Sequence, residues 1–302
     1  MSETKIIKAR GAGCVRQSLL VIILFLVIVA GIVGLTLLVV LLPVPDDQRI
    51  NIWLGGLFIF LFLMAGGGIV LGVWWIQRRA ALLDAAFTQL GLTGKAYLWN
   101  GRQYHGKFNG RQVDAYFYRG PSLDIYIASP LNTRLGIGLK GRLSQIASSE
   151  LNHPELVIND PELAHLGVYP LDERWGNELF GTTNAKAVIL RLTSSESSFE
   201  FRNLLFQPEA IQLQMNFINL RLITAENLRL WVNDLFDLAG MAESLPAPNV
   251  TAAASPMERK TRLNRSDFTL PIMGITCGII GFFAAIIFII VIVFINLGKG
   301  GF

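Results

Sequence analysis

Three glycines at the spacing of a dinucleotide-binding loop are the first residues whose pattern could support chemistry. Gly136, Gly138 and Gly141 match G-x-G-x-x-G, in which glycines let the backbone approach a pyrophosphate. Such a loop must follow a strand directly and open a helix, so that the phosphates meet the helix N-terminus. Here the preceding strand is expected to end near Ala128, and residues 130–134 intervene. We therefore interpret the glycines as a kinked strand and predict no cofactor.

The histidines are the next candidates, because imidazole can ligate a metal and can act as a base near neutral pH. His105, His153 and His165 are separated by 48 and 12 residues, which matches no local ligand motif. Cysteine gives no support, since the chain has only Cys14 and Cys277. We predict solvated histidines and no metal site.

A hydrolytic nucleophile would need a positioned base. Ser144, Ser148 and Ser149 precede His153, but the sequence contains no G-x-S-x-G elbow to present a serine. The sequence therefore predicts that the protein is not an enzyme.

The densest cluster of polar and aromatic residues is Asp-Glu-Arg-Trp at 172–175, with Glu178 one helical turn later. We interpret this cluster as the salt-bridged start of a helix, and a patch that docks a peptide or partner is the alternative. An enzyme whose site is assembled by the fold from scattered Asp, Glu and His also stays open. It would need a cleft lined by His105, Asp124 and Asp172.

The elements that must position these residues follow from the spacing of apolar side chains. Alternation of apolar and polar residues predicts strands at 104–108, 111–118, 123–128, 155–158, 186–192, 199–205 and 211–217. Three- and four-residue spacing predicts helices at 78–90, 142–149, 172–180 and 225–241. Asn109-Gly110 suits a tight hairpin turn, and Thr224 suits a helix N-cap. This order predicts an α+β domain with a mainly antiparallel sheet and flanking helices.

Three uncharged apolar runs, at 18–42, 52–76 and 268–297, dominate the rest of a chain that is 52% hydrophobic. Each exceeds the roughly 20 residues that a helix needs to cross a bilayer. We predict a membrane protein with three transmembrane helices and an inserted α+β domain. The predicted division is a basic cytosolic tail at 1–17, a transmembrane hairpin at 18–77, a cytosolic domain at 78–243, a flexible linker at 244–266, and a third transmembrane helix with a short external C-terminus at 267–302.

The formal net charge of +4 is concentrated beside the apolar runs. Lysine and arginine mark cytosolic flanks, which places the N-terminus and the domain in the cytosol and the C-terminus outside. Residues 80–258 hold 14 basic and 18 acidic residues, so we expect no nucleic-acid partner. The residues assigned to topology and to contact with lipid headgroups are Arg78, Arg79, Arg259, Lys260, Arg262 and Arg265.

Pairs of glycines four residues apart allow membrane helices to approach one another closely. Gly68 and Gly72 form such a pair in the second run, and Gly274 and Gly278 form another in the third. We predict that these glycines pack helices together, within the chain, between copies or with another protein.

Two short runs carry a family resemblance. They are Tyr-His-Gly-Lys-Phe-Asn-Gly-Arg-Gln-Val at 104–113, and Val-Tyr-Pro-Leu-Asp at 168–172 followed by Trp175 and Asn177. With the closing strand and the Leu/Ala-rich helix, they resemble a domain of unknown function in bacterial membrane-anchored proteins, labelled DUF3137, over about residues 80–243. The resemblance implies a bacterial inner-membrane location. It implies no activity, because its motifs are turns and core positions.

These patterns favour a membrane-anchored binding or scaffold protein that presents a cytosolic α+β domain. Its expected partners are the lipid bilayer and a membrane or cytosolic protein. An accessory subunit of a larger membrane complex, packed through its glycine-bearing helices, is the alternative besides the enzyme.

Overall fold

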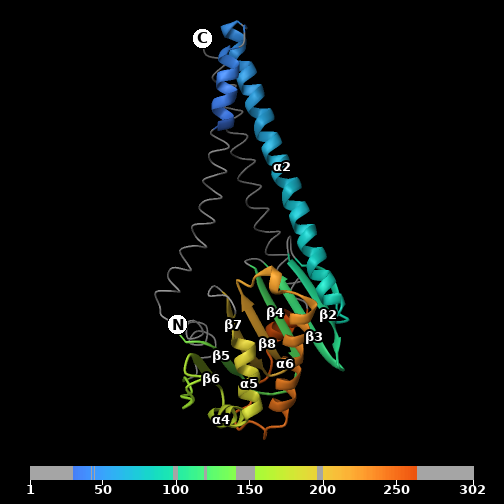
Figure 1. Ribbon diagram of the computed structural model, residues 1–302, viewed down its shortest axis with the longest axis vertical. Coiled ribbons are helices and arrows are strands. Elements are labelled where there is room, and N and C mark those ends of the chain that lie inside the picture. The colour runs from blue at the N-terminus through green and yellow to red at the C-terminus, as the bar shows by residue number, and fades with distance from the viewer. Residues whose placement is uncertain are drawn as a thin grey trace.

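The computed structural model describes residues 30–41, 43, 45–97, 101–118, 121–140, 154–195 and 200–263. A long helix, α2 (Asp46–Thr88), leads into an eight-stranded sheet in which every pairing is antiparallel (Figure 1). The strands are β1 (Thr93–Tyr97), β2 (Gly101–Phe108), β3 (Arg111–Tyr118), β4 (Ser122–Ala128), β5 (Leu135–Leu139), β6 (Leu166–Pro170), β7 (Phe201–Gln207) and β8 (Ala210–Asn216). Their spatial order is β1-β2-β3-β4-β8-β7-β5-β6. The structure is therefore an α+β fold.

The hairpin between β2 and β3 turns at Asn109 and Gly110, as the sequence predicted. Their φ angles are 47° and 83°, and a two-residue hairpin turn of this kind requires positive φ at both positions. The register then pairs His105 with Asp114 and Tyr104 with Ala115. This local turn fixes which residues of the two strands share a face.

The remaining elements are α4 (Glu173–Gly181), α5 (Thr183–Thr193), the short 3₁₀ turn η1 (Leu220–Leu222), α6 (Ala225–Glu243) and α7 (Pro256–Leu263). Figure 1 shows α5 and α6 side by side over one face of the sheet. Thr224 caps α6 as predicted, accepting a hydrogen bond from the backbone N–H of Asn227 at 3.2 Å.

The prediction of a strand at 186–192 is wrong, because this segment lies within α5. Its buried residues include Ala185, Val188, Ile189 and Leu192, which recur at three- and four-residue spacing. A helix places such residues on one face, whereas a strand would bury every second residue.

The predicted strand at 155–158 has no regular secondary structure, although the backbone N–H of Leu156 donates to the carbonyl oxygen of Val168 at 2.7 Å. The helix predicted at 142–149 lies outside the described residues.

The main core lies between the helices and the apolar face of the sheet, and the C-terminal end of α2 contributes to it. Phe87 of α2 is fully buried and stacks on Tyr104 of β2, with ring centroids 4.0 Å apart. Asp84 of the same helix accepts hydrogen bonds from the Tyr104 hydroxyl, at 2.8 Å, and from the Arg102 guanidinium. The end of α2 is thereby fixed to β2 by both apolar and polar contacts.

The second face of the sheet is polar yet largely buried. Gln103, Tyr116, Asp124, Gln214 and Asn203 lie opposite one another across β2, β3, β4, β8 and β7. Four of these side chains are at most 1% exposed, the exception being Gln214. Polar side chains share this face with a small cluster of buried aromatic residues, Tyr97, Tyr116 and Tyr126.

The prediction of three transmembrane helices in an inner-membrane protein is wrong on the described residues. Among them, no helix combines the length and the apolar character that a membrane crossing needs. The run at 52–76 is an internal part of α2, which begins at Asp46 and Asp47 and continues as one helix past Arg78 and Arg79. Residues 18–29 and 42 of the first predicted span, and all of 268–297, lie outside the described residues.

The glycines predicted to pack helices do not form the contact seen in the structure. A Cβ added to Gly68 or Gly72 would meet no described atom within 4 Å. The helical segment 30–41 instead approaches α2 at two other glycines, where Gly31 lies against the Phe60 ring and Gly56 against Leu35. Gly274 and Gly278 lie outside the described residues.

Residues 245–263 were predicted within a flexible linker, but they are attached to the sheet and to α4. The backbone N–H of Ala252 donates to the carbonyl oxygen of Asn132 at 2.7 Å, and α7 forms within the same segment. A free tether does not fit these contacts.

Candidate functional site

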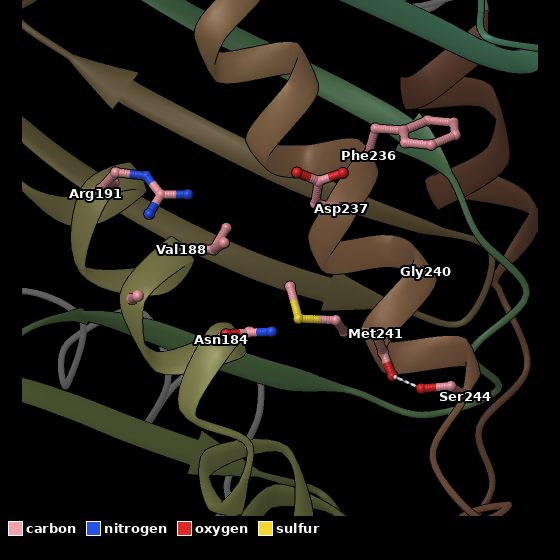
Figure 2. A pocket seen from close by; sticks show the side chains of 9 residues that line it. Asn184, Val188, Arg191, Phe236, Asp237, Gly240, Met241 and Ser244 are labelled. Atoms are coloured by element: carbon pink, nitrogen blue, oxygen red, sulfur yellow. Dashed lines mark hydrogen bonds between the residues drawn. The ribbon is translucent and has the colours of Figure 1, made fainter.

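An open groove of about 570 Å³ lies between α5 and α6 on the helical side of the domain (Figure 2). Its α5 wall carries Asn184, Ala187, Val188 and Arg191, and its α6 wall carries Phe236, Asp237, Gly240, Met241 and Ser244. The groove is a size that commonly accommodates ligands or peptide side chains.

The two helices run antiparallel, so the end of α5 lies beside the middle of α6 and the start of α5 lies beside the end of α6. The two ends of the groove are therefore lined by different residues. Arg191, near the end of α5, forms a two-pronged ion pair with Asp234 of α6, at 2.6 Å and 3.2 Å. Arg191 is more than half exposed, so this pair contributes at most about 1 kcal/mol. At the opposite end, Asn184 faces Met241, and the Ser244 hydroxyl donates to the Met241 carbonyl oxygen at 2.7 Å (Figure 2).

The middle of the groove is apolar and has spare room. Val188 and Met241 face each other there, and a Cβ added to Gly240 would meet nothing within 4 Å. Methionine has an unbranched and polarisable side chain that adapts to different partners. Asp237 is exposed beside this apolar stretch, close enough to Arg191 for its charge to act on that guanidinium.

The α6 wall is attached to the sheet beneath it. Arg111 of β3 places its guanidinium 5.2 Å from the Phe236 ring centroid and forms an ion pair with Glu243. The Ser129 hydroxyl also donates to Glu243, at 2.7 Å. The Arg111 hydrogen bond is the main reason that the pKa of Glu243 lies below its ordinary value. These contacts attach the α6 wall of the groove to the sheet.

The residues proposed for an enzyme site do not share a cleft. His105 lies on the second face of the sheet, where its Nδ1 is 2.7 Å from Asp114 Oδ1, and Asp124 is on that face two strands away. Asp172 begins α4, next to the end of β6. His165 precedes β6, and His153 lies outside the described residues.

Gly136 and Gly138 lie within β5, between antiparallel β6 and β7, and Gly141 is outside the described residues. A dinucleotide loop needs a parallel strand–helix crossover, which this arrangement does not provide. Within the described part of the chain, no three His, Cys, Asp or Glu residues are placed to hold a metal ion.

The cluster at 172–175 is the start of a helix, as predicted. Asp172 accepts a hydrogen bond from the backbone N–H of Trp175 at 3.1 Å, and Arg174 pairs with Glu178 at 2.8 Å. Asp172 also accepts from the backbone N–H groups of Asn249, at 2.5 Å, and Val250, at 3.1 Å. It therefore ties the segment after α6 to α4.

The charge state of Asp172 follows from its surroundings. Its side chain is buried, and burial alone would raise its pKa. The backbone N–H groups that surround the carboxylate outweigh burial, so the pKa is lowered.

The residues predicted to contact lipid headgroups mostly contact the protein itself. Arg78 lies over the Trp74 ring and Arg79 over the Phe117 ring, at 5.4 Å and 5.2 Å from the centroids. Arg259 and Arg262 both bind Glu209. Lys260 is exposed, and Arg265 lies outside the described residues.

Sequence reasoning missed the α5 side of the groove because it assigned that segment to a strand. The signal was present, since Ala185, Val188, Ile189 and Leu192 recur at helical spacing. The α6 side was within the predicted helix 225–241, but Ser244 lay beyond its end.

No protein-family model matches the chain, and no curated protein matches it. The resemblance to DUF3137 therefore stays a prediction. Among solved structures, the chain is similar to the mycobacterial trehalose monomycolate transport factor A, TtfA, with 9% sequence identity and a TM-score of 0.41. That similarity covers 58% of this chain and 98% of the other.

Proposed function

We propose that the domain is a non-catalytic binding module that holds an amphipathic helix of a partner protein in the groove between α5 and α6. The open, partly apolar groove is the observation that carries this proposal. Laying the apolar face of a helix into such a groove is a recurring mode of peptide recognition.

The lining defines the chemistry of the partner. Val188 and Met241 favour apolar side chains that recur at helical spacing, and the room above Gly240 admits a side chain of substantial size. Asp237 is exposed beside them and favours a lysine or arginine on the partner. The occupant that fits is therefore a helix with an apolar face and a basic residue at its margin.

The walls are held in place before any partner binds. Arg191 joins α5 to α6 through Asp234, and Arg111 joins α6 to the sheet through Glu243. A site that needs little rearrangement loses less entropy when it is filled, so a short helix can bind measurably.

The test is selection from a displayed library of helical peptides, carried out in parallel on the wild-type chain and on Gly240→Trp. The indole would occupy the open space in the groove. Arg229→Trp is the matched control, because position 229 is exposed on the same helix but about 16 Å away along its axis, from 11 residues at 1.5 Å each.

We expect peptides with apolar residues three and four apart and a flanking basic residue. Binding should weaken by about tenfold or more with Gly240→Trp, as expected for an occluded anchor pocket, and stay unchanged with Arg229→Trp. Urea unfolding would show that both variants fold. Selected peptides that bind Gly240→Trp as tightly as wild type, or that lack helical spacing, would refute the groove as the binding site.

A further inference from the structure

Helix α7 is attached to the rest of the protein by polar contacts. It has eight residues, none of which is buried, and charged and polar groups hold it against the sheet. Isolated helices this short are marginal in water, so its helical form depends on the surface it contacts.

Two arginines of α7 converge on a single carboxylate. Arg259 reaches Glu209, in the turn between β7 and β8, at 2.5 Å and 2.8 Å. Arg262, three residues later, lies 3.5 Å from the other oxygen of Glu209 and donates to its carbonyl oxygen at 2.8 Å. Residues three apart lie on the same side of a helix, which is why one acidic residue can bind both.

The two ends of α7 are fixed by further polar contacts. At its start, Ser255 and Glu258 form a capping box, and Arg134 pairs with Glu258. At its end, the buried Tyr116 hydroxyl, on the polar face of the sheet, donates to the Arg262 carbonyl oxygen at 2.6 Å. The surface therefore recognises both the charge and the backbone of the segment.

The charges of the two sides are complementary. The segment from Pro256 to Leu263 has three basic residues and one acidic residue, a net of +2. The surface that receives it presents Glu209, with the buried carboxylates of Asp114 and Asp124 on the same face of the sheet. Arg134 pairs with Glu258 of α7, and His105 pairs with Asp114 on the same face of the sheet.

We propose that the sheet surface around Glu209 is a docking surface for a basic segment with two arginines three residues apart, and that α7 is its occupant in cis. Because the contacts are polar, α7 can be displaced by a partner segment of the same pattern without disturbing the apolar core on the opposite face. This surface is separate from the α5–α6 groove, so Gly240→Trp leaves it unchanged.

The test uses a fluorescent peptide of residues 253–263 and the full chain carrying Arg259→Glu and Arg262→Glu, whose own α7 is repelled by Glu209. We expect this chain to bind the peptide more tightly than wild type does, because α7 no longer occupies the surface. Adding Glu209→Gln to it should weaken binding about tenfold or more, since charge-assisted contacts are lost. Binding should also weaken at least about fivefold between about 0.05 M and 0.5 M salt, where charges are screened.

A peptide that binds the double variant equally tightly with and without Glu209→Gln would overturn the proposal. So would a peptide that does not bind at concentrations up to about 1 mM, which corresponds to a binding free energy of about −4 kcal/mol.

Hydrogen exchange on the full chain with only Glu209→Gln provides a second measurement should the double variant not fold. We expect the α7 amides to exchange about tenfold faster or more than in wild type, because local opening becomes easier. Unchanged exchange would equally overturn the proposal.

Discussion

Replacing Asp172 tests how α4 and the segment after α6 are held together. Asp172 is 5% exposed, and its carboxylate accepts hydrogen bonds from the backbone N–H groups of Trp175, Asn249 and Val250. Asp172→Ala removes the acceptor for all three bonds. Loss of a helix N-cap costs about 1 kcal/mol. Each of the other two bonds contributes at the low end of about 1–3 kcal/mol, because the exposed residues 249 and 250 can bond to water instead.

The expected loss for Asp172→Ala is therefore about 2–4 kcal/mol in the free energy of unfolding by urea at neutral pH. Asp172→Asn keeps an acceptor for the cap but removes the charge, so it should lose about half as much. Hydrogen exchange should show faster exchange at Asn249 and Val250 in both variants. An alanine variant within about 0.5 kcal/mol of wild type, which is the range of ordinary surface changes, would refute this account.

The difference in free energy of unfolding between wild type and Asp172→Asn should depend on pH in one direction. The pKa of Asp172 is lowered in the folded state from its ordinary value of 3.8, so the unfolded chain takes up the proton first as pH falls. The stability advantage of wild type over Asp172→Asn should be complete above about pH 5 and should shrink as pH falls below about 4. An advantage that does not change over this range would show that the charge of Asp172 does not contribute.

Three further predictions concern two glycines and a buried tyrosine. Gly240→Ala should raise the free energy of unfolding by urea by about 0.5–1 kcal/mol, because alanine favours the helix and its Cβ meets nothing within 4 Å. Gly101→Ala should lower the free energy of unfolding in the same assay, because its Cβ would lie 2.6 Å from the Tyr97 carbonyl oxygen. A Gly101→Ala variant as stable as wild type would contradict the close packing at this position. Burial, assisted by the hydrogen bond to Asp84, raises the pKa of Tyr104, so stability should fall as pH rises above the unfolded value of about 10. Tyr104→Phe should reduce this loss of stability in unfolding experiments at alkaline pH. A variant that loses stability with pH as steeply as wild type would show that Tyr104 is not the cause.

Local features of the fold were determined by the sequence itself. The Asn109-Gly110 turn, the N-cap at Thr224 and the helix start at Asp172 each depend on residues within one turn of each other. The alternation at 211–217 likewise predicted a strand with one apolar face. Ile211, Leu213 and Met215 of β8 lie in the main core, whereas Phe217 lies beyond the strand and is 58% exposed. Such features are decided by backbone preferences and by short-range spacing, which can be recognised in a single sequence.

Two of the predictions that failed relied on a local sequence pattern where tertiary packing decides the outcome. The segment 186–192 is short and apolar, and such runs do not distinguish a strand from a helix until their packing is known. The run at 52–76 was assigned as an independent span from its apolar length, whereas the structure continues it as one part of a 43-residue helix and contains no membrane-crossing helix among the described residues.

Only the tertiary structure decided which distant segments meet. Arg134 pairs with Glu258 across 124 positions, Asp172 binds Asn249 across 77, and the groove requires α5 and α6 to lie side by side. No periodicity encodes these pairings, because each depends on the order of strands in the sheet and on which helix faces remain to be buried. The sequence alone therefore determined the turns, caps and apolar faces. The groove, and the surface that receives α7, exist only because packing brings remote residues together.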